Sequence, residues 1–119
     1  MAQYEHLPIY RQTMAFAVYI ETIVRNFSRY YKYSLGSDLR DLAHQSVFLV
    51  IQANNQAERL TTLFQLRDLF EQLKIMMRLC KEVKAFNNSQ SFIEGMTQIV
   101  NLSRQTEGWI KYINANNQN

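Results

Sequence analysis

Apolar residues recur at alternating steps of three and four along four stretches of this 119-residue chain. Such spacing places them on one face of an α-helix, because the helix completes a turn about every 3.6 residues. The chain has only three Gly and one Pro, too few for the frequent turns of an all-β fold. The spacing therefore predicts an all-α protein whose helices each turn one apolar face toward a shared core.

Polar, turn-forming residues separate these stretches and predict where the helices end. We expect four helices, at about 9–31, 37–54, 57–84 and 90–113. Ser37 is the expected N-cap of the second helix, 54–56 and 87–89 are the expected breaks after the second and third, and 114–119 is an expected disordered tail. Short links make neighbouring helices run antiparallel. The sequence thus predicts one domain, 1–119, with the architecture of an antiparallel up-down four-helix bundle.

The third predicted helix has the most regular apolar face. Its members are Leu63, Leu66, Phe70, Leu73, Met77 and Cys80. Cys80 is the only cysteine, so an internal disulfide is excluded, and its position on this face indicates a small buried hydrophobe. No charged segment followed by an apolar stretch indicates a signal peptide, and no apolar run approaches the roughly 20 residues of a membrane span. We therefore expect a soluble, cytoplasmic protein that does not contact a membrane.

Sequence motifs of catalysis are absent. The chain contains no Gly-rich phosphate loop, no Gly-x-Ser-x-Gly and no Cys-x-x-Cys. His44 follows Asp41 by three residues, but a di-iron bundle needs Glu-x-x-His motifs from two helices and two further carboxylates. We predict no catalytic residue, metal site, cofactor or small-molecule substrate, and interpret His44 as a surface or interface histidine. A metalloenzyme bundle stays as an alternative.

Basic residues follow one side of the third predicted helix, and two more lie on one face of the fourth. Those on the third helix are Arg67, Lys74, Arg78 and Lys81, at steps of seven, four and three, and those on the fourth are Arg104 and Lys111. Glu71 is the only acid interleaved on the first stripe. Arrays of this kind neutralise a phosphate backbone, so these six residues are the candidate nucleic-acid surface. Two alternatives are an acidic protein partner and a solvated face that only maintains solubility.

A basic and aromatic segment follows the first predicted helix. It comprises Arg25, Arg29, Tyr30, Tyr31, Lys32 and Tyr33. The tyrosines can stack on bases beside the cations, or they can cover the bottom of the core, as tyrosines at a helix end often do. The sequence leaves both interpretations open.

Several apolar residues lie off the predicted core faces. They are Val47, Phe48 and Ile51 on the second helix and Leu102 and Trp109 on the fourth. Gly108, beside Trp109, costs about 1 kcal/mol against Ala within a helix, which indicates that a neighbouring helix approaches closely there. A second apolar surface on a small protein marks an interface. We expect these five residues to form the contact surface of a homo-oligomer.

Four short motifs, taken in their order and spacing, resemble a known family. They are Tyr-Ser-Leu-Gly at 33–36, Gln-Ala-Asn at 52–54, Leu-Lys-Ile-Met-Met-Arg-Leu-Cys at 73–80 and Glu-Gly-Trp-Ile at 107–110. The similarity extends over about 100 residues. The chain resembles the accessory variability determinants (Avd) of diversity-generating retroelements, within the superfamily of four-helix-bundle proteins encoded in 23S ribosomal-RNA intervening sequences.

The resemblance implies a non-catalytic homopentamer, shaped as a tapered barrel with a basic surface. It implies binding to a reverse transcriptase and to template-repeat RNA, with cDNA as a further candidate partner, in support of mutagenic cDNA synthesis. A basic pair at i and i+4 on the third helix matters for these contacts in the family, and Lys74 and Arg78 match its positions. Lys74 stands where the family has Arg, which keeps the charge but removes the bidentate geometry. The alternative is an intervening-sequence-type bundle that only assembles with itself or binds protein or RNA.

Overall fold

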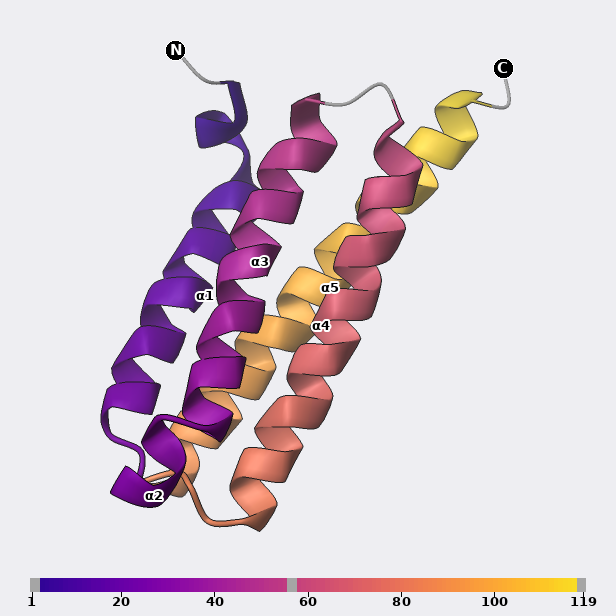
Figure 1. Ribbon diagram of the computed structural model, residues 1–119. Helices are drawn as coiled ribbons and strands as arrows, with labels where there is room; N and C mark the ends of the chain where they lie inside the picture. Colours follow the sequence, from indigo (N-terminus) through magenta and orange to yellow (C-terminus); the bar gives the residue numbers. More distant parts are fainter. Residues whose placement is uncertain (1–2, 56–57, 118–119) are drawn as a thin grey trace.

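The protein is entirely helical over the part of the chain that the computed structural model describes, residues 3–55 and 58–117, where no strand occurs. The elements are η1 (Gln3–His6), α1 (Pro8–Arg25), α2 (Arg29–Lys32), α3 (Leu35–Asn55), α4 (Arg59–Glu82) and α5 (Ser89–Asn117) (Figure 1). The prediction of an all-α fold with four long helices is confirmed. No helix among these residues is long and apolar enough to cross a membrane.

The four long helices lie side by side and alternate in direction, as an up-down bundle requires (Figure 1). α3 packs between α1 and α4, and α5 contacts α4 and, less extensively, α1. The bundle is elongated, with principal extents of 52 × 29 × 21 Å. The short helix α2 lies at one end, beside the connection from α4 to α5. This end brings together segments that are far apart in the sequence.

The first helix is shorter than its apolar pattern predicts. α1 begins at Pro8, where a proline is tolerated in the first turn, but it ends at Arg25 rather than near residue 31. The chain leaves the helical path because Phe27 packs its ring edge-on against Phe86, with the centroids 5.1 Å apart. The backbone N–H of Ser28 also donates to the carbonyl of Ala85 at 3.3 Å. Contacts with the α4–α5 connection therefore end α1, and α2 follows as a separate turn.

The second long helix begins earlier than predicted, so the N-cap role expected of Ser37 is wrong. α3 starts at Leu35, and the N–H of Asp38 already donates to the carbonyl of Ser34 at 3.1 Å. Gly36 is buried in the first turn, where an added Cβ would lie 2.7 Å from Val24 Cγ1 and 3.2 Å from the carbonyl oxygen of Tyr31. Glycine is needed there because α3 approaches α1 and α2 closely, and not because a helix ends.

Lys84 has a backbone conformation that residues other than glycine and asparagine rarely adopt. After α4, its φ is 62°, in the left-handed region. Its N–H donates to the carbonyl of Lys81 at 3.0 Å, while that of Ala85 donates to Cys80 at 2.9 Å. This pair of bonds is the Schellman arrangement, whose left-handed position is usually occupied by Gly. A lysine there carries backbone strain on the order of 1 kcal/mol.

The remaining helix ends agree with the sequence to within a few residues, with one exception. The break after residue 54 is present, although positions 56 and 57 lie outside the described residues. The Asn88 side chain accepts a hydrogen bond from the Ser91 N–H at 2.9 Å at the start of α5. The prediction of a disordered tail is wrong for 114–117, which extend α5, and 118–119 lie outside the described residues.

The core is formed by the apolar faces of all four long helices. Every member of the predicted α4 face, from Leu63 to Cys80, is fully buried. Five buried residues carry a hydroxyl group, namely Thr13, Ser46, Thr62, Ser103 and Thr106. Three of these hydroxyls bond to a carbonyl of their own helix: Thr13 to Ile9 at 2.6 Å, Ser46 to Ala43 at 2.6 Å and Thr106 to Leu102 at 2.9 Å. No buried side-chain polar atom of the described residues lacks a partner. Polar groups therefore enter this core without a desolvation penalty.

Candidate nucleic-acid interface

The predicted basic stripe lies on the side of α4 that faces α5. The Lys81 ammonium group stands over the Phe92 ring of α5, 4.8 Å from its centroid. This contact is a cation–π interaction between the two helices. Arg67 and Lys74 are partly exposed, and Arg78 is exposed to solvent. The stripe therefore borders the junction of α4 and α5 and is accessible to a large ligand.

Local acids neutralise part of the stripe. Lys74 Nζ lies 2.9 Å from Glu71 Oε1, and Arg67 Nε lies 3.6 Å from Asp68 Oδ1. The sequence indicated Glu71 as the interleaved acid, but the pairing of Arg67 with its chain neighbour Asp68 was missed. Both pairs are exposed, so each contributes little to stability and can be exchanged for a phosphate. Arg78 forms no ion pair with another described residue.

The two candidate cations of α5 lie on the helix next to the stripe. Arg104 and Lys111 are exposed and form no ion pair within the described ranges. Arg104 lies ~18 Å along α5 from Phe92, and Arg67 lies ~21 Å along α4 from Lys81, at 1.5 Å per residue. Because α4 and α5 are antiparallel and Lys81 meets Phe92, Arg104 lies near the level of Arg67. That the six cations form one extended array, suited to a polymer with repeated charges, stays a prediction.

The tyrosines of α2 and of its C-cap differ in burial, so one covers the core and two are free to stack on a ligand. Tyr31 is half-buried and packs against the core, as a covering residue would. Tyr30 and Tyr33 are 82% and 78% exposed. The sequence did not connect Lys84 with this segment. Ala85, the residue after Lys84, is hydrogen-bonded to Ser28, the residue before α2, and this tertiary contact is not visible in the sequence.

The predicted second apolar surface is only partly on the surface. Phe48 is 68% exposed, and Ile51 and Trp109 are half-buried. Val47 and Leu102 are buried within this chain, at 8% and 1% exposure, so their placement away from the core is wrong. α3 and α5 each pack against two other long helices, and their buried faces are therefore wider than one narrow stripe. Whether the exposed members contact another subunit stays a prediction.

Gly108 does not have the close neighbour that its sequence position indicated. A Cβ added at Gly108 would meet no atom within 4 Å. The expectation that another helix of the same chain approaches closely there is wrong. Other large apolar side chains are exposed on the long helices, among them Met14, Val18, Phe64, Ile75, Leu79 and Ile93. The uncovered apolar surface is thus distributed over α1, α4 and α5 as well as α3.

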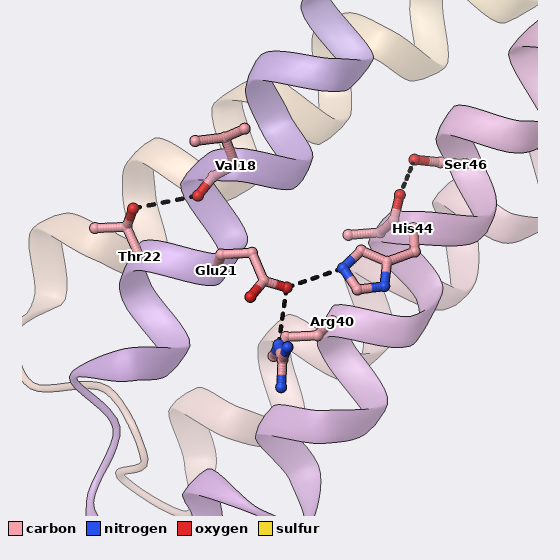
Figure 2. A network of polar contacts seen from close by, with 7 residues as sticks. Val18, Glu21, Thr22, Arg40, His44 and Ser46 are labelled. Carbon is pink, nitrogen blue, oxygen red and sulfur yellow. Dashed lines mark hydrogen bonds and ion pairs between the residues drawn. The ribbon is translucent and has the colours of Figure 1, made fainter.

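His44 belongs to a polar contact between α1 and α3. Glu21 Oε2 accepts a hydrogen bond from Arg40 Nε at 2.8 Å and lies 2.9 Å from His44 Nε2 (Figure 2). The hydrogen bond from Arg40, and to a smaller extent the one with His44, lowers the pKa of the Glu21 carboxyl group. These side chains are partly exposed and connect two helices at the surface. Among the described residues no group of three or more His, Cys, Asp and Glu could hold a metal ion.

Comparison with known proteins gives one match. The family model described as bAvd-like matches residues 7–113, which include all four long helices except the last turn of α5. No curated protein and no solved structure matches the chain. The matched range contains every candidate cation of the α4–α5 side and the whole of α2.

Proposed function

This chain belongs to the bAvd-like family, and on that premise we propose that it is a non-catalytic accessory protein of a diversity-generating retroelement. In this proposal it acts in the cytoplasm and binds a reverse transcriptase and template RNA, with cDNA as a further ligand. It thereby supports mutagenic cDNA synthesis, while the chemistry belongs to the polymerase. The family match over residues 7–113 is the observation that carries the proposal.

The α4–α5 side supports the nucleic-acid part of the proposal. Arg78, Arg104 and Lys111 are exposed and form no ion pair with the described residues, so their charge is available to an anionic ligand. Cations that neutralise phosphates release counterions, and this release is the main source of affinity for a nucleic-acid backbone. We propose the six residues of this array as the contact surface for RNA or for the polymerase: Arg67, Lys74, Arg78, Lys81, Arg104 and Lys111.

Charge reversal at the centre of the array tests the proposal. The double variant Lys74→Glu, Arg78→Glu should bind template-repeat RNA at least about tenfold more weakly near 0.15 M salt, because two attractive charges become repulsive. It should also co-purify less reverse transcriptase. Fluorescence anisotropy and affinity pull-down measure the two effects, and circular dichroism verifies that the helices remain.

A matched control separates a local contact from net charge. Arg11→Glu changes an exposed α1 residue by the same substitution as Arg78→Glu, so the two single variants have equal net charge. Only Arg78→Glu should weaken binding substantially. Equal losses in both variants, or an unchanged salt dependence in the double variant, would show that the array is only a solvated face.

A second candidate function is an intervening-sequence-type bundle that only assembles with itself or binds protein or RNA. The exposed apolar side chains, Phe48 above all, favour assembly. Co-purification with a reverse transcriptase of a diversity-generating retroelement distinguishes the candidates. No association in the presence of RNA would contradict the accessory role and leave the assembly module.

We propose that the assembly is a homopentamer and that Phe48, Ile51 and Trp109 contribute to its contacts. Phe48→Asp should dissociate it, because a carboxylate would replace a large apolar group in a desolvated contact. Sedimentation velocity at micromolar concentration should show the shift from pentamer to smaller species. Tyr33→Asp is the control, because Tyr33 is comparably exposed but lies directly after α2, outside the proposed contact residues. A monomeric wild type, or an intact pentamer in Phe48→Asp, would refute this assignment.

A further inference from the structure

The end of the bundle at α2 combines exposed aromatic rings with cations. The two most exposed large apolar or aromatic residues of the described chain, Tyr30 and Tyr33, both lie here, at 82% and 78% exposure. Large aromatic surfaces left in water are unfavourable and often mark a contact site. Nothing else in the described chain covers these two rings.

Each of the two rings contacts one chain neighbour and is otherwise exposed. Tyr30 lies edge-on to Tyr31, with ring centroids 4.8 Å apart and an interplanar angle of 80°. Tyr31 itself packs against the core, so it fixes the position of Tyr30 from below. The Lys32 ammonium group stands 6.0 Å from the centroid of the Tyr33 ring. Both tyrosines therefore present most of a ring to solvent.

Cations outnumber acids in the segment between α1 and α3. Between Glu21 and Asp38 the sequence contains three cations and no acid. From the α4–α5 connection Lys84 joins them, because its neighbour Ala85 is hydrogen-bonded to Ser28. Glu82 is the nearest acid in sequence to Lys84. The cations at this end that form no ion pair with the described residues are Arg25, Arg29, Lys32 and Lys84.

The backbone at Lys84 gives an independent indication of function. With φ at 62° in a Schellman turn, this position favours glycine, which would relieve the strain. Strained backbone positions cluster at binding sites, where a side chain is needed despite its cost in stability. The residue at 84 is an exposed lysine, next in the chain to Ala85, which is hydrogen-bonded to Ser28 just before α2.

From these features we infer that this bundle end, defined by Arg29, Tyr30, Lys32, Tyr33 and Lys84, is a second nucleic-acid site that binds single-stranded RNA. Bases stack on Tyr30 and Tyr33, and the three cations neutralise the adjoining phosphates. The inference rests on the proposed function for the kind of ligand, but its residues are separate from those of the α4–α5 array. The second site gives the protein a way to hold an unpaired template segment while the array contacts the backbone elsewhere.

Single-stranded RNA fits this end better than duplex RNA or a membrane. Bases in a duplex are already stacked, so exposed tyrosines gain nothing from them, whereas unpaired bases have free faces. A helix that lies in an anionic membrane surface buries a continuous apolar face, and α2 is one turn of four residues, Arg-Tyr-Tyr-Lys, too short to form one. The combination of ring and cation instead matches the surfaces that bind unpaired nucleic acid.

Fluorescence anisotropy with an unstructured 20-nucleotide oligouridine RNA, and with an RNA duplex of equal length, tests the inference on the full chain. Tyr30→Ala and Tyr33→Ala should each weaken binding of the single strand about tenfold and leave duplex binding nearly unchanged. Replacing Arg29, Lys32 and Lys84 with Gln should reduce the slope of log K against log salt concentration by about 2 for the single strand. Tyr112→Ala, an exposed tyrosine near the other end of α5, is the matched control and should have no effect.

Variants of Lys84 separate a role in RNA binding from a role in stability. Lys84→Gly should raise the melting temperature by about 4 °C, because it relieves the left-handed backbone, and yet weaken binding of the oligouridine. Lys84→Gln should weaken binding equally without raising the melting temperature. If Lys84→Gly binds the single strand as tightly as the wild type, the lysine has no role in the site.

The possible results separate this inference from the proposed function. If Lys74→Glu, Arg78→Glu abolishes binding while the tyrosine variants bind normally, the second site is refuted and the accessory role stands. If the tyrosine variants lose single-strand binding but no reverse transcriptase co-purifies with the wild type, the site stands and the accessory role fails. Tyrosine-dependent binding to phosphatidylserine vesicles, without a tyrosine effect on oligouridine, would overturn the inference in favour of a membrane surface.

Discussion

Cys80 in the folded protein should react with iodoacetamide at pH 8 at least about 100-fold more slowly than in the urea-unfolded chain. The side chain is fully buried on the apolar face of α4. This burial, with a smaller contribution from the negative charge of Asp38, raises the pKa of the thiol from its ordinary value of 9.0 to about 11. The thiolate is the reactive form, and two pKa units reduce its population about 100-fold. Mass spectrometry of alkylation against time, with and without urea, measures the ratio.

The raised pKa of Cys80 also makes the fold sensitive to alkaline solution. The folded pKa lies above the unfolded one, so the stabilisation is fully present below pH 9 and is lost as the pH rises toward about 11. The expected loss in the free energy of unfolding is on the order of 2–3 kcal/mol. Lysines and tyrosines also titrate in this range, so Cys80→Ala is the control. Equal pH dependence of urea unfolding in wild type and Cys80→Ala would contradict the assignment.

Phe70→Ala should remove much of the stability of the bundle, about 3–5 kcal/mol. Phe70 is fully buried in the centre of α4 and is among the largest side chains of the core. Its truncation loses the transfer free energy of the ring and leaves a cavity that a rigid bundle fills poorly. Domains of this size unfold at a cost of about 5–15 kcal/mol, so the variant should be close to unfolding. Urea or thermal denaturation followed by circular dichroism measures the change.

Phe64→Ala is the matched control for the core substitution. Phe64 lies on the same helix and undergoes the same substitution, but it is 39% exposed and carries the Arg67 guanidinium group over its ring at 4.9 Å. Losing a half-exposed ring and one surface cation–π contact should cost roughly 1–2 kcal/mol. If both variants lost the same stability, burial would not determine the energetics of α4.

The positions of the four long helices could be predicted from sequence because apolar periodicity is a local signal. The α4 face from Leu63 to Cys80 is buried as its spacing predicts. The same reasoning erred at two positions because it assigned each helix one narrow buried stripe. Val47 and Leu102 lie off the narrow stripe and are nonetheless buried, because α3 and α5 each contact two other long helices. The three-four spacing of apolar residues gives the direction of a buried face but not how many neighbouring positions it includes.

The candidate site was predictable as a list of cations but not as an electrostatic surface. Helical spacing places four cations on one side of α4, namely Arg67, Lys74, Arg78 and Lys81. Spacing does not show that Lys74 is paired with Glu71, nor that Lys81 is turned toward Phe92 of α5. Which charges remain available to a ligand depends on side-chain conformations and on the neighbouring helix.

The sequence by itself determined that this chain is all-α, where its long helices lie, and which family it resembles, since these follow from helical periodicity and from motifs in order along the chain. The tertiary structure alone decided how the bundle end at α2 is formed. There α1 stops short of its apolar pattern, and the α4–α5 connection that contains Lys84 comes to lie beside the segment that leads into α2. The physical reason is that Ser28 binds Ala85 and Phe27 packs on Phe86, contacts between segments nearly sixty residues apart that no local pattern encodes.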